Sequence, residues 1–250
     1  MLFSAFDLVE MCRGFRLRLS FIVNTRGHVL MMRKLVGFLS VLITALLCAS
    51  AYAQPAIQTL NIESDEGAAL LERLREGGLV MYIRHADTTG QQCDTYNYSA
   101  GREGQRNISS MGREQAAELG KQIEELGIPM AEPILSGPVY RARDTAELAF
   151  GVDRVSVTDS LLADDYARGR LDWVLSEHRR LFSEPVGQGE NRVLVGHRTP
   201  AQMIFGSILS GTSLPEAGVL VLEPRGSEGT EMLGVLEIVP AINGGNPPCL

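Results

Sequence analysis

The sequence predicts an α/β fold, a three-layer α/β/α sandwich around a mainly parallel central sheet with antiparallel strands at its edge. The first observation is that short apolar runs alternate with segments whose apolar residues recur at helical spacing. The second is the run 79–83, five apolar residues that read as a strand buried on both faces of a parallel sheet. The third is the composition, 45% hydrophobic and 21% charged over 250 residues, which supports one sizeable core.

Residues 1–53 are predicted to be an N-terminal extension and secretory signal peptide in front of a domain at 54–250. The basic start at Met32, the apolar run 35–47 and the small residues before and at Ala53 form the three parts of such a signal. The apolar run is too short for a comfortable membrane span, which favours removal over anchoring. We therefore expect translation to start at Met32, cleavage after Ala53, and a periplasmic or secreted protein without a stable membrane anchor.

The chain is acidic. Its net charge of −7 becomes −11 without residues 1–53, which hold six Lys and Arg and two Asp and Glu. Nucleic acid and anionic membrane surfaces are therefore excluded as expected partners, because both require an excess of basic side chains. An anionic substrate must be bound by a local cluster of arginines.

Two cysteines, Cys93 and Cys249, remain after the predicted cleavage. In an oxidising compartment they form either a disulfide or two free thiols, and the sequence fits both alternatives.

Helices are predicted where helical spacing is accompanied by an end signal. Ser64 is placed to cap the first helix and Gly77 to end it. Ser109 begins the second, and Pro200 suits the first turn of the last. Trp173 is expected to pack in the core. The predicted helices span 65–76, 109–126, 139–150, 171–182 and 199–209.

Strands are predicted from short runs of β-forming residues bounded by turn signals. The last two are joined by the polar loop 224–231 and are expected to be the antiparallel edge. The loop 87–107 is polar and long, which is typical of a functional loop. The predicted strands span 79–83, 133–135, 155–158, 192–196, 218–223 and 233–239.

Three predicted strands end near residues that suit an anion. Arg84 and His85 follow the first strand, Arg141 lies on the helix after the second, and His197 follows the fourth. The carboxyl ends of parallel strands share one edge, so we expect these side chains to converge. Guanidinium groups bind phosphate oxygens, and a neutral imidazole is a competent nucleophile toward phosphorus. The four residues therefore predict a phosphate pocket.

Other chemistries lack their signatures. The sequence has no glycine-rich nucleotide loop ending in Lys-Ser or Lys-Thr, no Gly-x-Ser-x-Gly elbow and no cysteine or histidine spacing suited to zinc. No cofactor and no metal ion are expected.

Four ordered motifs within about residues 78–205 resemble the histidine phosphatase superfamily, also called phosphoglycerate mutase-like, and its branch 1 in particular. The resemblance implies the phosphoglycerate mutase-like fold and a phosphatase. The motifs are Arg84-His85-Ala86, Asn107-Ile108-Ser109-Ser110-Met111-Gly112, Ser136-Gly137-Pro138-Val139-Tyr140-Arg141-Ala142-Arg143-Asp144-Thr145-Ala146 and Val193-Leu194-Val195-Gly196-His197.

The resemblance also implies roles for single residues. His85 resembles the nucleophile that becomes phosphorylated, and His197 the second histidine of the pocket. Arg84 and Arg141 resemble the phosphate-binding arginines. Asn107 falls where the family often places a further polar contact.

Two positions depart from the family pattern. Ala86 replaces the usual glycine after the first histidine, and Arg198 follows His197 where the acid-phosphatase branch has a proton-donating aspartate. In the other branch the proton donor is an acidic residue in a loop after the third strand, for which Asp164 is the best match. Asp165 and Asp87 are the alternatives.

These features predict an exported phosphatase that hydrolyses a small phosphomonoester or phosphoramidate through a phosphohistidine on His85. The alternative is a weakly active or inactive phosphate-binding or interaction protein that retains the pocket. Arg102 and Arg106, in the long loop, either reach the substrate or face water. The identity of the substrate and the oligomeric state do not follow from the sequence.

Overall fold

The computed structural model describes residues 56–89, 94–95, 98–209 and 213–242. The predicted signal peptide, its cleavage site and both remaining cysteines lie outside these residues. The helices and strands are β1 (Thr59–Asn61), α3 (Asp65–Glu76), β2 (Val80–Arg84), α4 (Ser110–Glu125), β3 (Ile134–Ser136), α5 (Tyr140–Phe150), β4 (Val155–Val157), α6 (Asp164–Ala167), α7 (Leu171–Ser183), β5 (Arg192–Gly196), α8 (Arg198–Phe205), β6 (Val219–Pro224) and β7 (Thr230–Glu237).

The seven strands form one mixed sheet in the order β1-β7-β6-β2-β5-β3-β4, which confirms the predicted α/β fold. Only β6 runs against the other described strands, because it pairs antiparallel with both β2 and β7. One detail differs from the expectation. The antiparallel strand lies inside the sheet, since β1 pairs in parallel with β7 and forms the edge. This three-residue strand is too short to show a pattern in the sequence.

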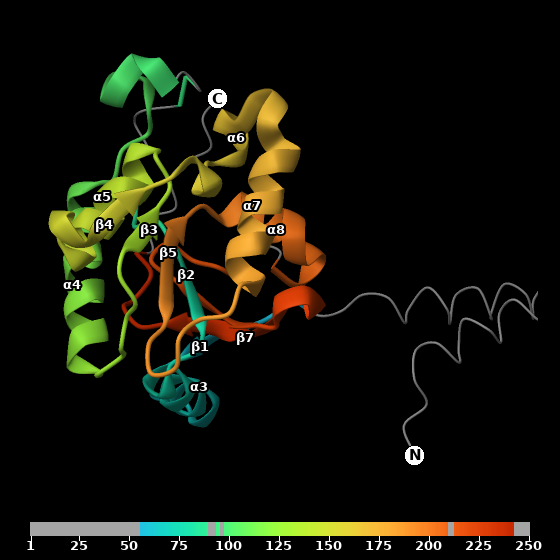
Figure 1. Ribbon diagram of the computed structural model, residues 1–250. Coiled ribbons are helices and arrows are strands. Elements are labelled where there is room, and N and C mark those ends of the chain that lie inside the picture. The colour runs from blue at the N-terminus through green and yellow to red at the C-terminus, as the bar shows by residue number, and fades with distance from the viewer. Residues whose placement is uncertain (1–55, 90–93, 96–97, 210–212, 243–250) are drawn as a thin grey trace, which may run out of the picture. The chain divides into compact units, whose positions relative to one another are not determined.

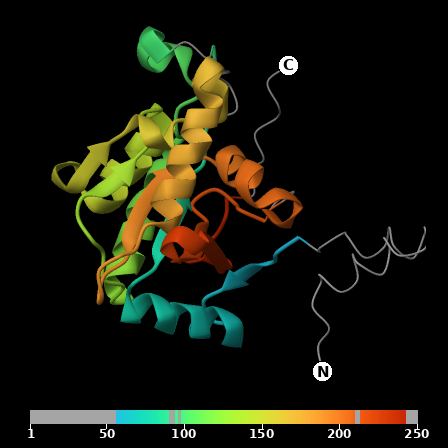
Figure 2. The ribbon, with the colours of Figure 1, turned by 45° about the vertical axis from the view of Figure 1, so that its right-hand side comes forward.

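Helices cover both faces of the sheet, as the sandwich prediction required. One core cluster joins the sheet to α3, α4 and α5, and a second joins its other face to α7 and α8. Figure 1 shows α4 and α5 on one side of the strands and α7 and α8 on the other, and Figure 2 shows α3 beneath the sheet. Each β-strand that carries site residues is therefore shielded from water on both faces.

The capping signals lie where the sequence placed them. The Ser64 hydroxyl accepts a hydrogen bond from the Gly67 amide at the start of α3, and the Ser109 hydroxyl does the same for Gly112 in α4. The predicted last helix is shorter as an α-helix, because a 3₁₀ turn replaces it from Gly206, whose φ is 70°. The expected burial of Trp173 is wrong: the side chain is 44% exposed, and the Arg170 guanidinium lies 5.6 Å from its ring centroid.

No helix among the described residues is long and apolar enough to cross a membrane.

Strand register brings the two histidine-bearing segments together. Arg84 at the end of β2 stands opposite Gly196 at the end of β5, and the His85 amide donates to the Gly196 carbonyl at 3.0 Å. β3 pairs with β5 on its other side, with Ser136 opposite Val195. The carboxyl ends of three neighbouring parallel strands thus meet at one edge, where sites form in open α/β sheets.

Candidate active site

His85 is the first residue beyond β2, and its tautomer is fixed by a backbone contact. Its Nδ1 lies 2.8 Å from the Ala86 carbonyl, which only accepts hydrogen bonds, so Nδ1 carries the proton and Nε2 keeps its lone pair. Burial lowers the pKa of His85 well below its usual value, and the charges of Arg84 and Arg141 lower it further. At neutral pH the imidazole is therefore uncharged, the state that a nucleophile requires.

Ala86 fits its position without the freedom of glycine. The residue is fully buried, and its amide donates to the Thr145 hydroxyl of α5 at 2.9 Å. That hydroxyl in turn donates to the Arg141 carbonyl at 2.7 Å. Ala86 is not among the described residues with positive φ, so the departure from the family's usual glycine costs no backbone strain here.

Arg84 is held from behind by a loop that precedes β6. Its Nη1 donates to the Leu214 carbonyl at 3.0 Å, and its Nη2 donates to the Glu216 carboxylate at 2.9 Å. Burial lowers the pKa of Arg84 to about 10, so the guanidinium stays charged at neutral pH. Burial also raises the pKa of Glu216, despite the opposing charge of Arg84. Glu216 could not be identified from the sequence, because nothing in its local pattern points to the pocket.

Arg141 lies in the first turn of α5 and is likewise held by a carboxylate. Its Nη1 lies 3.1 Å from both oxygens of Asp94, which also accepts from the Tyr166 hydroxyl at 2.7 Å. The start of α5 is fixed by Gln105, whose side-chain oxygen accepts from the Tyr140 amide at 2.9 Å. The long loop therefore supports the start of α5 and Arg141. The sequence gives no sign of the roles of Asp94 and Gln105, since one acid and one amide in a polar loop have no periodic pattern.

His197 follows β5 and is the N-cap residue of α8. Its ring centroid lies 5.4 Å from that of His85. Burial lowers the pKa of His197 well below its usual value, and the nearby charge of Arg141 adds to the effect. The His197 imidazole is therefore uncharged at neutral pH, and the charge of a bound anion would oppose these effects.

These residues line one cavity of about 80 Å³. It contains two histidines and four arginines, facing two aspartates. The lining residues are Arg84, His85, Arg106, Arg141, Asp164, Asp165, His197, Arg198 and Thr199. The structure thus brings together Arg84, His85, Arg141, His197 and Asp164, all from the predicted site.

The cavity also collects the unsatisfied polar atoms of the described residues. The buried side-chain nitrogens that have no hydrogen-bond partner there are Nε of Arg84, Arg106 and Arg141 and Nε2 of His197. Buried polar atoms are normally paired, and the three arginine nitrogens can only donate, so this lining indicates a site for a ligand rich in acceptor oxygens. Arg106 therefore lines the pocket. Of the two positions that the sequence left open for its side chain, this favours contact with the substrate over exposure to water.

The structure distinguishes the three candidate proton donors, because two of them line the cavity and one does not. Asp164 and Asp165 begin α6 and line the cavity, and the Thr199 side chain hydrogen-bonds to Asp164. Burial raises the pKa of Asp164, and the charge of Asp165 raises it further. Asp87 is not among the lining residues, and its carboxylate accepts from the Ser109 hydroxyl at 2.5 Å. Asp87 therefore anchors the start of α4 to the segment after β2.

Asn107 is not among the residues that line the cavity. Its side-chain amide donates to the carbonyls of Arg102 and Gln105 at 2.8 Å each, which holds the loop. The predicted contact with phosphate stays a prediction. Arg102 is held by both oxygens of Asp144, at 2.6 and 2.7 Å, and so clamps the same loop onto α5.

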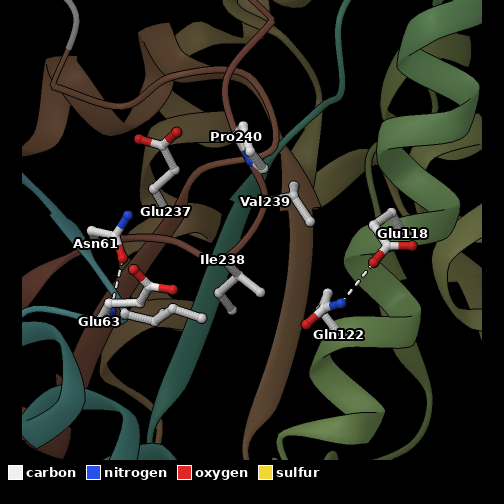
Figure 3. Close-up of a pocket in the computed structure, with 9 residues that line it drawn as sticks. Asn61, Glu63, Glu118, Gln122, Glu237, Ile238, Val239 and Pro240 are labelled. Carbon is white, nitrogen blue, oxygen red and sulfur yellow. Dashed lines mark hydrogen bonds between the residues drawn. The ribbon is translucent and has the colours of Figure 1, made fainter.

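A larger cavity, of about 320 Å³, has the opposite character. Figure 3 shows the side chains around it, which come from the ends of β1 and β7 and from α4. Three of them are the carboxylates Glu63, Glu118 and Glu237, and no lining residue is basic. A phosphate would be repelled there, so size does not identify the site. Among the described residues no group of histidine, cysteine, aspartate and glutamate is arranged to hold a metal ion.

Residues 80–164 match the histidine phosphatase superfamily (branch 1). Over this segment the chain is similar to the histidine phosphatase superfamily. The match includes Arg84, His85, Arg141 and Asp164 and ends before β5. The place of His197 in the site therefore rests on its geometry beside His85.

No curated protein matches the chain. Among solved structures, the protein histidine phosphatase SixA complexed with tungstate is 12% identical, with a TM-score of 0.45, over 64% of this chain and 97% of that one. A phosphoserine phosphatase from Entamoeba histolytica in complex with 3-phosphoglyceric acid is 14% identical, with a TM-score of 0.43, over 63% of this chain and 95% of that one. The assignment of the site rests on the contacts in this chain.

Proposed function

We propose that this histidine phosphatase hydrolyses a small phosphomonoester or phosphoramidate through a phosphohistidine on His85. The observation that carries the proposal is the set of four buried, unpaired nitrogens in the lining of one cavity beside a neutral imidazole. A phosphoryl group supplies acceptor oxygens for the arginine and histidine donors and a phosphorus atom for the His85 Nε2 lone pair.

The first step forms a nitrogen–phosphorus bond. The Nε2 lone pair of His85 attacks phosphorus, the bond from phosphorus to the leaving oxygen or nitrogen breaks, and the leaving atom takes that electron pair. Arg84, Arg106 and Arg141 stabilise the negative charge on the oxygens of the transferring group. Asp164 gives its proton to the leaving atom.

The second step restores the enzyme. A water molecule attacks phosphorus, its proton passes to the Asp164 carboxylate, and the nitrogen–phosphorus bond breaks to return the electron pair to His85 Nε2. The raised pKa of Asp164 supports this role, because it increases the fraction of the carboxyl that carries a proton at a given pH.

The cavity supports a small reacting group. A volume of about 80 Å³ suits a phosphoryl group, whereas pockets that enclose a whole drug-sized molecule have roughly 300–1,000 Å³. The remainder of the substrate would lie outside this cavity. The net charge of the chain, −7, disfavours polyanionic substrates beyond the one group that the arginines bind.

The test is an assay of the purified full-length chain on a panel of phosphomonoesters and phosphoramidates beside the variant H85A. We expect turnover by the wild type and a loss of several orders of magnitude in H85A. An H85A variant as active as the wild type would refute the assigned nucleophile. Vanadate binding without turnover by the wild type would instead support the alternative, an inactive phosphate-binding protein, which Arg198 after His197 first suggested.

We also propose that the protein is exported and acts in the periplasm or outside the cell. The support is the basic, apolar and small-residue order of residues 32–53. N-terminal sequencing of the protein from cell fractions tests it, with Gln54 expected as the first residue of the exported form. A mature chain that begins near Met1 and stays inside the cell contradicts it.

A further inference from the structure

We infer that Tyr82 is a positioning residue for the reaction, because its hydroxyl holds the backbone of His197 and so sets where the second imidazole of the pocket lies. The inference rests on the proposed function. Tyr82 lies on β2, two residues before Arg84, and its side chain is fully buried on the sheet face that α7 and α8 cover. It does not line the cavity, so it acts on the chemistry only through His197.

One hydroxyl binds both polar groups of the His197 backbone. The Tyr82 hydroxyl donates to the His197 carbonyl at 2.7 Å and accepts from the His197 amide at 2.9 Å. These atoms lie at the point where β5 ends and α8 begins, where the sheet ladder no longer holds the chain. The contact therefore fixes the residue that has left the strand, across a separation of 115 residues in sequence.

Gly196 makes this contact sterically possible. A Cβ atom on Gly196 would lie 2.5 Å from the Tyr82 hydroxyl oxygen and 2.9 Å from the ring carbon that bears it. Such distances are closer than side-chain carbons approach other atoms. Gly196 has no positive φ, so space for the phenol, and not backbone freedom, explains glycine at this position.

The phenol ring is itself clamped by α7. Phe182 and His178 pack edge-on against it, with ring centroids 5.1 and 5.9 Å away. His178 Nδ1 donates to the Val174 carbonyl at 2.8 Å, which leaves Nε2 as the atom that faces the Tyr82 hydroxyl at 3.4 Å. The helix, the phenol and the His197 backbone thus form one buried series of contacts.

The imidazole of His197 depends on this support. Its Nε2 is buried without a hydrogen-bond partner among the described residues. A displacement of the backbone at residue 197 therefore moves the ring relative to His85 and to the phosphoryl group. Misplacing a reacting group by 1 Å costs up to about 100-fold in rate.

The experiment compares the full-length wild type with Y82F, which removes the hydroxyl and keeps the ring contacts. We expect kcat on 4-nitrophenyl phosphate to fall roughly 10- to 100-fold with KM changed less than about threefold, as for an interaction that matters in the transition state. T230V is the matched control, because it removes another side-chain hydrogen bond to a carbonyl, from Thr230 to Glu223 in the hairpin of β6 and β7. T230V should retain kcat.

A second pair of variants tests the same contact from the other side. G196A places a methyl group against the Tyr82 hydroxyl, and its effect on kcat should be smaller in the Y82F background, where that oxygen is gone. Equal effects of G196A in both backgrounds, or a Y82F kcat within twofold of the wild type, would overturn the inference.

A binding readout separates this inference from the proposed function. The imidazole resonances of His197, assigned with H197Q, are followed by NMR during titration with orthovanadate. Y82F should shift the His197 resonances of the free protein and weaken vanadate binding, whether or not the wild type turns over a phosphomonoester. An inactive wild type would defeat the proposed function alone, whereas His197 resonances and vanadate affinity unchanged in Y82F would defeat the positioning role.

Discussion

Gly120 lets α4 and α5, the two helices on the Arg141 side of the sheet, lie close together. The variant G120A tests this close approach. A Cβ atom on Gly120 of α4 would lie 1.8 Å from the Ala149 carbonyl oxygen of α5. The helices must separate by at least about 1.2 Å before this contact reaches 3.0 Å, the lower limit for a real Cβ. Because α5 carries Arg141, the methyl group should disturb both stability and phosphate binding.

The expected magnitudes follow from that displacement. Forcing an extra methyl group into a packed interface costs roughly 1–3 kcal/mol, against a gain of up to about 1 kcal/mol in helix propensity from Gly to Ala. The net loss should lower Tm by a few degrees in a domain of this size. A shift of Arg141 by about 1 Å should lower kcat/KM by roughly 10- to 100-fold.

Thermal unfolding and steady-state kinetics of G120A measure the two effects, with G169A as the matched control. A Cβ atom on Gly169 meets nothing within 4 Å, so G169A makes the same substitution without a clash. We expect G169A to match the wild type in Tm. A G120A variant with unchanged Tm and unchanged vanadate affinity would refute the close approach of α4 and α5.

Two further predictions concern protons. D164N should lower kcat on alkyl phosphates by roughly 10²- to 10⁴-fold, and far less on 4-nitrophenyl phosphate, whose leaving group needs no acid. D165N is the comparison variant and should lower kcat less than D164N does. Equal losses of kcat on both substrates in D164N would remove Asp164 from the acid role. The free energy of unfolding should fall as the pH drops below about 6.5, the ordinary pKa of histidine. Burial lowers the pKa of His85, His178 and His197 in the folded protein, that of His178 to about 4. Below pH 6.5 the unfolded chain therefore binds more protons than the folded chain, which favours unfolding. Urea unfolding at several pH values measures the slope, and a stability that does not change between pH 7 and 5 contradicts the lowered pKa values.

The central part of the site could be predicted because it follows from a rule of sheet topology. Arg84 ends one strand whose apolar run is plain in the sequence, His85 and His197 stand directly after such strands, and Arg141 follows a third. Parallel pairing alone then brings them to one edge. The position of Asp164 in the lining required the family resemblance as well, since a short acidic loop has no periodic pattern.

The supporting residues could not be predicted, because their partners are distant in sequence and their local patterns are ordinary. Glu216 meets Arg84 across 132 residues, and Asp94 meets Arg141 across 47. In the sequence Tyr82 looks like one more apolar residue of a buried strand. In the structure its hydroxyl binds the backbone of His197, which no sequence pattern indicates. Strand β1 and the exposure of Trp173 were not predicted for the same reason, because both depend on tertiary packing and not on the local sequence.

If the proposed function holds, the carboxylates behind Arg84 and Arg141 have a consequence for turnover. In the structure Glu216 is paired with Arg84 and Asp94 with Arg141. Without these partners, departure of inorganic phosphate would leave two buried, uncompensated cations, which is energetically costly. With them, the pocket attracts a phosphoryl group less strongly but releases the product more readily. On the proposed mechanism, the acidic neighbours would thus hold the affinity for phosphate low enough for repeated catalytic cycles.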